Sequence, residues 1–398
     1  MGSTGSIGTN TLNVIRQHRE DFDVVSLSAG SSLEFLKKQV EEFKPRYVSL
    51  ATEALAASFR SSLPADLKVE VFAGNSGHRR CIELGMPEML MSAMMGTHGL
   101  EATLQGVLQN VKILGIANKE ILVMAGTFIL AALEESQTTL IPVDSEHSAI
   151  FQALMGNKVS QVKTLLLTGS GGPFRTRESS TFGAITKEEA LKHPNWIMGS
   201  KITVDSATMM NKGLEYIEAL RLFRIHRSQL KIVIHPESIV HSAVEYVDGS
   251  VMAQLGNSDM RIPISLALNY PDRLPLNFDR PFDLVKIGKL TFEEPDLEKF
   301  RCLKLAMNFD RYGPHGAVTL NAANESAVDL FLKDKIRFIE ISQMVEGALE
   351  EFENRSIFSL NDVIEFDAEV KEWVISQALA HRPSLGRRAS VEHEKIRV

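Results

Sequence analysis

Short apolar runs alternate with amphipathic stretches along the amino-terminal part of the chain. Runs such as 23–27 and 47–50 have the composition of buried strands, whereas 11–18 and 33–43 have the spacing of helices with one apolar face. Strands that alternate with helices are typical of a doubly wound parallel sheet, so we expect a Rossmann-type domain here. Further strands of the same domain are predicted near 89–93, 112–117 and 138–143.

A glycine-rich loop precedes the first predicted helix. The chain opens with Gly2-Ser3-Thr4-Gly5-Ser6-Ile7-Gly8, and glycines at this spacing allow backbone N–H groups to approach a pyrophosphate at the positive end of a helix. The strand that feeds such a loop is missing, because Met1 stands beside the first glycine. Burial of three apolar side chains in that strand would contribute about 5 to 9 kcal/mol, so we expect the natural start to lie upstream.

The second predicted strand ends where a bound dinucleotide places its adenosine ribose. That position holds Ala29-Gly30-Ser31-Ser32, which has no Asp or Glu to accept a hydrogen bond from a free 2′-hydroxyl. The absence favours NADPH over NADH. The two serines can donate hydrogen bonds to a 2′-phosphate, although they bring no charge.

Composition narrows the functional classes. A chain of 398 residues, with 44% hydrophobic and 23% charged residues, is globular and long enough for two or three domains. The net charge of -7 argues against nucleic acid as a partner. Cys81 and Cys302 are far apart, which excludes a disulfide scaffold and fits a reducing cytoplasm. No apolar run reaches the roughly 20 residues of a membrane span, and we expect neither a membrane partner nor a signal peptide.

The segment Pro142-Val143-Asp144-Ser145-Glu146-His147 is the most distinctive acidic motif. Asp144 and Glu146 are two positions apart, so an extended backbone would direct both to one side. Two carboxylates that face one point repel each other unless a cation or a proton lies between them. With Glu215 as the candidate third acid, the set would suit Mg²⁺ or Mn²⁺. The alternative is a solvated turn, with His147 as an ordinary hydrogen-bonding residue at a helix start.

Three further polar segments each allow two interpretations. Asn118-Lys119-Glu120 follows a predicted strand, at the sheet edge where ligands bind, but it can also be an N-capping Asn with a surface Lys. The loop Thr168–Pro173 can form an anion nest or a tight turn. The loop His193–Gly199 carries Trp196, which is either part of a lid over a ligand or an anchor to the core.

The region after this loop is predicted to contain a strand at 201–204 and a helix that runs to Phe223. In that helix Asn211, Lys212 and Glu215 share one face, because they lie three or four residues apart. An amide, an ammonium and a carboxylate suit a hydroxylated, anionic, metal-bound ligand. The alternative is a surface ion pair, which contributes little to stability.

These segments together resemble the 1-deoxy-D-xylulose 5-phosphate reductoisomerases, a family of NADPH-dependent enzymes of isoprenoid precursor synthesis. The resemblance covers nearly the whole chain up to about Ile375, and the stretch 204–219 is highly specific. The segments that carry it are 2–8, 117–120, 142–147, 167–174, 193–219, 235–241, 248–255, 259–261 and 320–325.

The resemblance implies an α/β fold in several parts. These are an NADPH-binding domain at 1–143, a catalytic, metal-binding and dimerisation domain at 144–270, a proline-rich linker at 271–296 and a helical carboxyl-terminal domain at 297–378. The chain departs from the family in two of these respects: the first strand of the NADPH-binding domain is absent, and residues 379–398 are expected to form a disordered tail. The resemblance also implies a cytoplasmic bacterial enzyme that forms a homodimer.

The same resemblance implies roles for individual residues. Asp144, Glu146 and Glu215 would hold the divalent cation, Mg²⁺ or Mn²⁺, and His241 would lie just behind the active site. The residues implied in catalysis are Lys119, Glu146, His193 and Trp196. Those implied in binding a small sugar phosphate are Ser145, Glu146, Ser170, His193, Met198, Ser206, Asn211, Lys212, Glu215 and Met260. Those implied in binding NADPH are Thr4, Gly5, Ser6, Ile7, Gly30, Ser31, Ser32, Asn118, Lys119, Glu120 and Gly199.

The implied reaction has two stages. 1-Deoxy-D-xylulose 5-phosphate would be rearranged by retro-aldol cleavage and recombination, and NADPH would then reduce the aldehyde to 2-C-methyl-D-erythritol 4-phosphate. Lys119 and a metal-bound water are both candidates for the general base. Two other functions stay open: a metal-independent dehydrogenase acting on a phosphorylated hydroxy acid, and a non-catalytic NADP-binding regulator.

Overall fold

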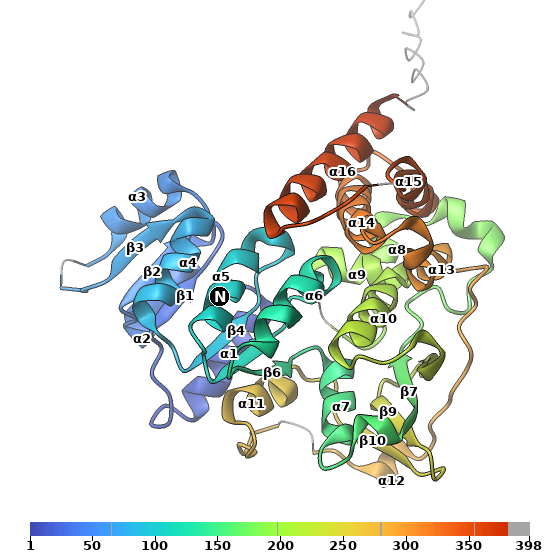
Figure 1. The fold of residues 1–398 in the computed structure, drawn as a ribbon, viewed down its shortest axis with the longest axis horizontal. Helices are drawn as coiled ribbons and strands as arrows, with labels where there is room; N and C mark the ends of the chain where they lie inside the picture. The colour runs from blue at the N-terminus through green and yellow to red at the C-terminus, as the bar shows by residue number, and fades with distance from the viewer. Residues whose placement is uncertain (65, 197, 279–280, 354, 381–398) are drawn as a thin grey trace, which may run out of the picture.

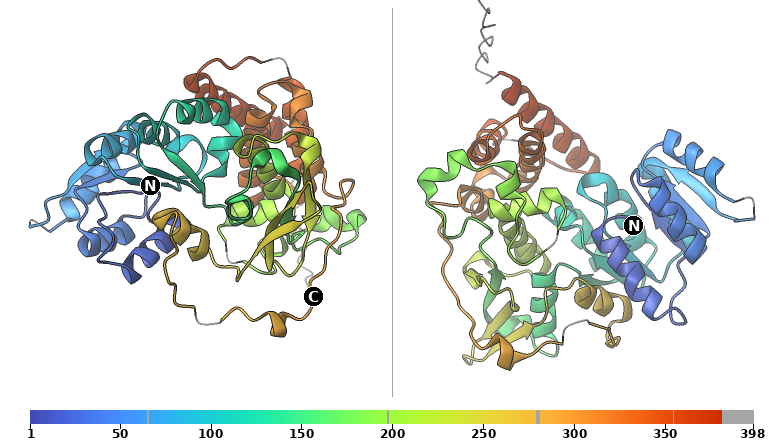
Figure 2. Two further views of the ribbon diagram at one scale, coloured as in Figure 1. Left: turned by 60° about the horizontal axis from the view of Figure 1, so that its bottom comes forward. Right: turned by 180° about the vertical axis from the view of Figure 1, so that it is seen from behind.

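The computed structural model describes residues 1–380 apart from 65, 197, 279–280 and 354 (Figure 1). From residue 381 on, the tail expected at 379–398 lies outside the described residues. The described chain forms an amino-terminal β/α region, a middle region around a mixed sheet, and a helical carboxyl-terminal region, which lie side by side (Figure 2). In this part of the chain, no helix combines the length and the apolar composition that a membrane span requires.

Parallel strands separated by helices build the amino-terminal region, which confirms the Rossmann-type expectation. They form two three-stranded sheets, in the orders β1-β2-β3 and β4-β5-β6, and every strand pair is parallel. The strands are β1 (Ser26–Ser28), β2 (Tyr47–Leu50), β3 (Glu70–Ala73), β4 (Met89–Ser92), β5 (Ile113–Ile116) and β6 (Thr139–Pro142). The helices are α1 (Ser6–Gln17), α2 (Leu33–Phe43), α3 (Glu53–Ser62), α4 (Gly74–Gly85), α5 (Leu100–Leu108) and α6 (Lys119–Glu134).

The parallel sheet is divided between β1 and β4. Among the described residues, neither strand pairs with another across this division. The first residues of the chain lie there: the Met1 nitrogen donates to Met91 O at 2.8 Å, and the Ser3 N–H donates to Ser28 O at 2.8 Å. The start of the glycine-rich loop therefore contacts the last residue of β1 and the next-to-last residue of β4.

A four-stranded sheet in the order β10-β9-β7-β8 is the centre of the middle region. Strand β7 pairs with β8 in parallel and with β9 in antiparallel orientation, and β10 is the antiparallel edge strand. The strands are β7 (Val162–Gly169), β8 (Leu230–Ile234), β9 (Val240–Tyr246) and β10 (Val251–Leu255). The helices are α7 (Ser145–Leu154), α8 (Lys187–Ala190), α9 (Ser200–Ala207), α10 (Met210–Leu222) and α11 (Arg261–Asn269).

The prediction of a strand at 201–204 is wrong. This β-branched run lies in α9, where Lys201 Nζ forms an ion pair with Asp205 Oδ2 at 2.9 Å, one helical turn later. Ion pairs at this spacing stabilise a helix. Burial of Thr203 and Val204 in α9 adds tertiary packing, which overrides the strand preference of β-branched residues.

Helices make up most of the carboxyl-terminal region. Helix α14 packs against both α15 and α16. An aromatic cluster of Phe174, Phe182, Phe300, Phe331 and Phe338, with ring centroids 5.3 to 6.1 Å apart, joins this region to the middle one. The helices are α13 (Arg301–Met307), α14 (Gly316–Leu332), α15 (Phe338–Glu351) and α16 (Leu360–Ala380), while the short α12 (Leu284–Ile287) lies in the segment that precedes them.

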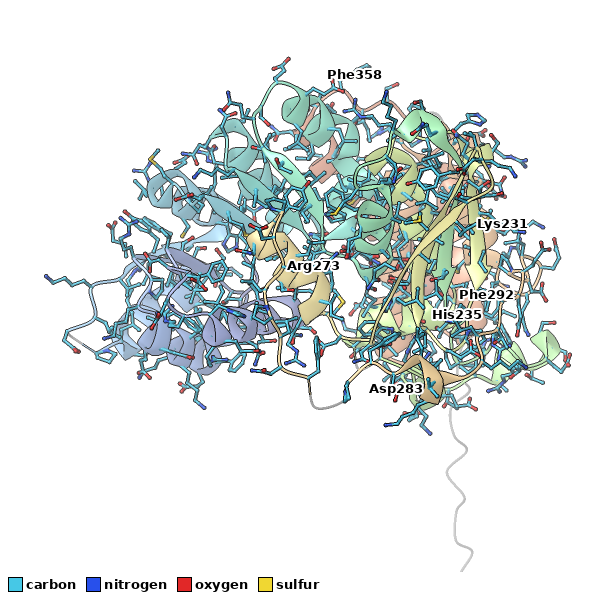
Figure 3. The ribbon with its side chains drawn as sticks, turned by 90° about the horizontal axis from the view of Figure 1, so that it is seen from below. Lys231, His235, Arg273, Asp283, Phe292 and Phe358 are labelled. Atoms are coloured by element: carbon cyan, nitrogen blue, oxygen red, sulfur yellow. The ribbon has the colours of Figure 1, made fainter. Side chains whose placement is uncertain are left out.

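The segment between α11 and α13 runs along the outside of the middle region (Figure 3). It contains the prolines that predict an extended linker. Glu293 forms an antiparallel bridge with Ile234 at the end of β8. Next to it, the Phe292 ring stacks on His235 with centroids 4.8 Å apart. The carboxyl-terminal end of the segment is thus fixed to the edge of the mixed sheet.

Helix α6 is bent, and a side chain of α10 satisfies carbonyl groups at the bend. Ala125 has non-helical angles (φ -117°, ψ 18°) inside α6. Arg221 Nη1 donates to the carbonyl oxygens of Leu122 and Val123, at 2.6 and 2.5 Å. Burial lowers the pKa of Arg221 to about 10, so the guanidinium stays charged at neutral pH. This contact fixes α6, and Lys119 at its start, relative to α10.

Replacement of Arg221 tests this contact. In Arg221→Met two buried carbonyl groups lose their donor, at about 1 to 3 kcal/mol each, so we expect a loss of unfolding free energy of about 2 to 6 kcal/mol. Arg224→Met is the matched control, because Arg224 pairs with Glu134 on the surface and should contribute less than about 1 kcal/mol. Urea unfolding followed by circular dichroism measures both; equal losses would contradict this role of Arg221.

Candidate active site

A cavity of about 180 Å³ is lined by residues that follow β5, β6 and β7 and by residues of α10. The carboxyl ends of the strands are where open α/β sheets bind ligands. The cavity brings together most of the predicted site residues: Ser6, Ile7, Lys119, Asp144, Ser145, Glu146, Ser170, His193, Trp196, Met198, Gly199, Ser206, Asn211, Lys212, Glu215 and Met260.

The other predicted residues lie outside this lining. Asn118 is buried and caps α6: its Oδ1 accepts the N–H of Ile121 at 3.3 Å, and its Nδ2 donates to Gly96 O at 3.0 Å. The capping alternative therefore holds for Asn118, whereas Lys119 is buried in the cavity and not on the surface. The remaining residues outside the lining are Thr4, Gly5, Gly30, Ser31, Ser32 and Glu120.

Three carboxylates converge in the cavity. One oxygen from each of Asp144, Glu146 and Glu215 lies within 4.8 Å of the others. Asp144 is the N-cap of α7, and its Oδ1 accepts the N–H of Glu146 at 3.1 Å and that of His147 at 3.4 Å. The first two acids therefore converge by a geometry that differs from the predicted one. A cap residue and a first-turn side chain face the same helix end, whereas we expected alternation along a strand.

Two ammonium groups balance these carboxylates. Lys119 Nζ donates to Asp144 Oδ2 and to Glu215 Oε1, each at 2.8 Å. Lys212 Nζ contacts the other oxygen of Glu215 and lies 3.6 Å from Glu146 Oε1. A buried charge is stable only when it is paired, so the lysines allow the carboxylates to be buried together.

The pairing fixes most of the charge states. Burial opposes the charge of Lys119, but Asp144 and Glu215 outweigh it and raise the Lys119 pKa well above its usual value. Burial also opposes the charge of Asp144, yet Lys119 and His147 hold the Asp144 pKa well below its ordinary range. Burial raises the pKa of Glu146 to about 7. At neutral pH, Lys119 is therefore an ammonium and Asp144 a carboxylate.

His147 lies behind the carboxylates and orients two of them. Its Nδ1 is 3.1 Å from Asp144 Oδ1 and 3.3 Å from Glu218 Oε2, and its Nε2 is 3.0 Å from the backbone oxygen of Glu215. Burial opposes the imidazolium, but Glu218 and Asp144 raise the His147 pKa to about 9. The sequence reasoning missed Glu218; its position three residues after Glu215 on a predicted helix is the signal that could have found it.

The loop after β7 forms a polar end of the cavity. Gly171 and Gly172 have positive φ angles (82° and 71°). A Cβ on Gly172 would lie 2.4 Å from Ser206 O, so only glycine allows the loop to approach α9 so closely. Ser170 Oγ accepts the Gly172 N–H at 3.2 Å and lies 3.3 Å from His193 Nε2. The segment is thus a tight turn that also presents the Ser170 hydroxyl to the cavity.

His193 organises the loop that carries Trp196. Its Nδ1 accepts the N–H groups of Asn195 and Trp196, at 3.1 and 2.9 Å. Burial lowers the His193 pKa to about 4, so the ring is neutral and its proton is on Nε2, which faces Ser170. Trp196 is only partly buried, and it lines the cavity together with Met198. The centroid of its ring lies 6.2 Å from the centroid of the His241 ring. Its position supports a cover over the cavity more than an anchor to the core.

A second polar network joins three helices beside the cavity. Lys201 Nζ pairs with Glu120 Oε1 and with Asp205 Oδ2, each at 2.9 Å. Asn324 Nδ2 donates to Asp205 Oδ1 at 2.7 Å. The network connects α6, α9 and α14, and only its Lys201–Asp205 pair has a spacing along the chain that predicts a contact.

Comparisons with known proteins indicate the same family in each part of the chain that they match. The family model described as 1-deoxy-D-xylulose 5-phosphate reductoisomerase matches residues 1–126. Two models described as carboxyl-terminal domains of that enzyme match residues 140–223 and 255–373. The 1-deoxy-D-xylulose 5-phosphate reductoisomerase of Agathobacter rectalis is 49% identical over 378 residues, which cover 94% of this chain and 98% of that protein. The enzyme of the same name from Chloroherpeton thalassium is 47% identical, with coverages of 95% and 97%.

Solved structures of similar proteins contain ligands. The 1-deoxy-D-xylulose 5-phosphate reductoisomerase from Zymomonas mobilis in complex with NADPH has a TM-score of 0.88 and 38% identity, and the match covers 95% of this chain and 97% of that one. A DOX-P reductoisomerase in complex with NADPH, fosmidomycin and magnesium has a TM-score of 0.90 and 36% identity, with coverages of 96% and 98%.

Replacement of Lys119 tests the charge balance of the cavity. In Lys119→Met the buried Asp144 and Glu215 lose a counterion, and we expect the metal-free protein to lose about 3 to 5 kcal/mol of unfolding free energy. Millimolar Mg²⁺ should restore part of that loss, because it binds the folded state. Lys163→Met is the control, since Lys163 pairs with Glu245 at the surface and should contribute less than about 1 kcal/mol with or without Mg²⁺. Urea unfolding in EDTA and in Mg²⁺ provides the comparison; a loss that Mg²⁺ leaves unchanged would contradict the prediction.

Proposed function

Because the chain belongs to the 1-deoxy-D-xylulose 5-phosphate reductoisomerase family, we propose that the cavity around Asp144, Glu146 and Glu215 is where it performs that family's reaction. The chain is an NADP-dependent oxidoreductase that converts 1-deoxy-D-xylulose 5-phosphate to 2-C-methyl-D-erythritol 4-phosphate, and its cofactors are NADPH and a divalent cation. The observation that supports this cavity is the convergence of three carboxylates between the turn that carries Ser170 and the glycine-rich loop of the Rossmann region.

The donor set fits a hard divalent cation. Asp144, Glu146 and Glu215 offer only oxygen atoms, which Mg²⁺ and Mn²⁺ prefer. When bound, the cation supplies Lewis acidity toward the oxygens of the substrate. His147 and the α7 backbone hold Asp144 in its orientation, so this ligand is in place before a cation binds.

Ser170, Ser206, Asn211 and Lys212 bind the substrate phosphate in this proposal. The Lys212 ammonium would make a charge-assisted hydrogen bond to it. The neutral His193 ring adds a donor, because its Nδ1 is already occupied by two backbone N–H groups and its Nε2–H faces Ser170. The phosphate would thereby hold the reacting end of the substrate next to the carboxylates.

Lys119 would donate a charge-assisted hydrogen bond to a substrate oxygen. Its raised pKa keeps it protonated at neutral pH, and this argues against Lys119 as the general base. Ser145 has a hydroxyl that donates to Glu146 Oε2 at 2.6 Å, so it orients that carboxylate. Closure of the loop with Trp196 and Met198 would exclude water from the reactive species.

The start of α1 would bind the NADPH pyrophosphate. The N-cap Gly5 brings no side chain, and the first turn has no acidic residue, so its N–H groups can meet an anion. Ser6 and Ile7 line the cavity, which would bring the bound cofactor close to the substrate for hydride transfer. The exposed Ser31 and Ser32, at the start of α2, stay the candidates for the 2′-phosphate.

A homodimer is part of the proposal, as is a cytoplasmic location. Strand β10 is an edge strand whose outer side has no partner among the described residues. Val251 and Met252 on this strand are 54% and 51% exposed. Edge strands with exposed apolar residues associate readily, so this strand is where a second copy would bind.

The two free, buried cysteines, Cys81 and Cys302, fit a reducing compartment.

Glu215→Gln tests the function and the third metal ligand together. The rate of NADPH oxidation with 1-deoxy-D-xylulose 5-phosphate and Mg²⁺, measured by absorbance, should fall at least about a hundredfold in this variant. That factor corresponds to a rise of roughly 3 kcal/mol in the activation free energy. Glu245→Gln, a surface carboxylate on β9, should keep the wild-type rate. Reduction without any divalent cation would favour the metal-independent dehydrogenase. A folded wild-type chain that binds NADPH but does not oxidise it would favour the regulator.

Substitution on β10 tests the dimer. The double variant Val251→Asp with Met252→Asp would bury charges between two copies, so we expect the dimer dissociation constant to rise at least about tenfold. Leu108→Asp is the control, because Leu108 is 63% exposed on α5 in the other half of the molecule. Analytical ultracentrifugation over a concentration series measures both, and an unchanged dimer in the double variant would place the interface elsewhere.

A further inference from the structure

Asn195 joins the loop that carries Trp196 to the turn between β8 and β9. Its Nδ2 donates to Pro236 O at 2.7 Å and to Ser238 Oγ at 2.8 Å. An amide nitrogen carries two hydrogens, so each acceptor receives one of them. Asn195 itself is exposed, whereas Ser238 lines the cavity. The loop is therefore fastened to the neighbouring turn at a point directly beside the cavity.

The backbone next to this amide is fixed relative to Trp196. His193 Nδ1 accepts the N–H groups of both Asn195 and Trp196, at 3.1 and 2.9 Å, so these residues form one compact unit. The centroid of the Trp196 ring lies 6.2 Å from that of His241 in β9, the strand that begins directly after the turn. Release of the Asn195 side chain from the turn would therefore displace Trp196 as well.

The turn that receives Asn195 is held from outside by the segment that follows α12 (Figure 3). The Nδ1 of the buried His235 lies 2.8 Å from Thr291 O, and its Nε2 accepts the N–H of Ile239 at 3.1 Å. Because Nε2 accepts a hydrogen bond, the ring proton is on Nδ1 and is donated to Thr291 O. The Phe292 ring stacks on this imidazole with centroids 4.8 Å apart. His235 thus connects both ends of the turn to the outer segment.

Further contacts keep the turn in one conformation. The ring of Pro236 fixes its own φ angle, and the Ser238 N–H donates to His235 O at 3.1 Å, which closes the turn. Glu237 Oε1 accepts the Thr291 hydroxyl at 2.6 Å. Pro236 O and Ser238 Oγ are therefore held in place, and docking of the loop requires no rearrangement of the turn.

We propose that Asn195 is a positioning residue for the proposed reaction, on which this inference rests: its amide docks the loop on the β8–β9 turn and sets the fraction of molecules in which Trp196 and Met198 cover the cavity. Both hydrogen bonds are exposed, so water competes for the same groups and their net contribution is small. Contacts of this strength suit a loop that has to open for substrate entry and product release. Loss of both should lower the ratio of covered to open molecules by about five- to thirtyfold.

The effect on the rate follows from that ratio. Because the cover excludes water from the reactive species, chemistry takes place in the covered state, and kcat/KM is proportional to the covered-to-open ratio. We therefore expect Asn195→Ala to lose about five- to thirtyfold in kcat/KM. The free energy of unfolding should stay close to that of the wild type, because the side chain is exposed.

Fluorescence of Trp196 measures the docking of the loop directly. The chain has two tryptophans, so Trp373→Phe leaves Trp196 as the only one, and it keeps an aromatic ring against Phe352. In this background, Asn195→Ala should raise the acrylamide quenching constant of Trp196 at least about twofold, because the open population grows. Asn195→Asp should raise the constant too, because it keeps the size of the side chain but removes its donors.

Asn308→Ala is the matched control. Asn308 Nδ2 also donates to a backbone oxygen at the surface, that of Lys304 at 2.7 Å, but in the carboxyl-terminal region. This variant should leave both the quenching of Trp196 and kcat/KM at the wild-type values.

Three outcomes would overturn the proposal. Unchanged quenching in Asn195→Ala would mean that the loop docks without this amide. Increased quenching with an unchanged kcat/KM would mean that the reaction does not need the docked position. An equal loss of kcat/KM in Asn308→Ala would mean that the loss is not specific to this contact. Quenching requires no turnover, so a failure of the docking is distinguishable from a failure of the proposed function.

Discussion

The repulsion among carboxylates buried at one point governs how the site is built. Two unit charges 4 Å apart repel by about 4 kcal/mol at an effective dielectric constant near 20, and Asp144, Glu146 and Glu215 lie within such distances of one another. The compensating groups come from different elements: Lys119 from α6, Lys212 from α10 and backbone N–H groups from the start of α7. The site is therefore stable only when all three helices are docked.

That requirement explains features at a distance from the carboxylates. Lys119 reaches Glu215 only if the first turn of α6 is held against α10, and Arg221 supplies this contact at the bend of α6. The network around Lys201 makes a second connection, from Glu120 on α6 to α9 and α14. Polar contacts of this kind restrict orientation more strongly than apolar packing does, because their geometry must be satisfied in a low dielectric. The three regions of the chain are therefore aligned by charge as well as by packing.

The sequence predicts what local pattern determines. The alternation of strands and helices gives the Rossmann region, and the Asn211–Glu215 face is recognisable because spacing along one helix sets which side chains face together. The convergence of Asp144 and Glu146 is also predicted, but by strand alternation, whereas the structure achieves it through a helix N-cap. The strand predicted at 201–204 fails because a long-range context, burial beside Lys201 and Asp205, outweighs β-branched composition. Glu218 lies three residues after Glu215 on the same predicted helix, and this spacing is a usable signal for it. The Asn324 contact is not recognisable from the sequence, since it joins residues 119 positions apart.

Helix α11 explains why the nucleotide and substrate parts of the molecule form one site. It follows the mixed sheet in sequence, yet Ile264, Ala267 and Leu268 are in the same hydrophobic cluster as Leu12 and Ile15 of α1. Met260, directly before α11, lines the cavity beside the carboxylates. The chain thus returns from the catalytic region to cover the helix that begins at the glycine-rich loop. Because α1 is held from one face by α11 and at its start by the tight loop, displacement of either would change the distance between Ser6 and Glu146 across the cavity. Binding of the cofactor and assembly of the acidic centre are therefore linked through the packing of α1.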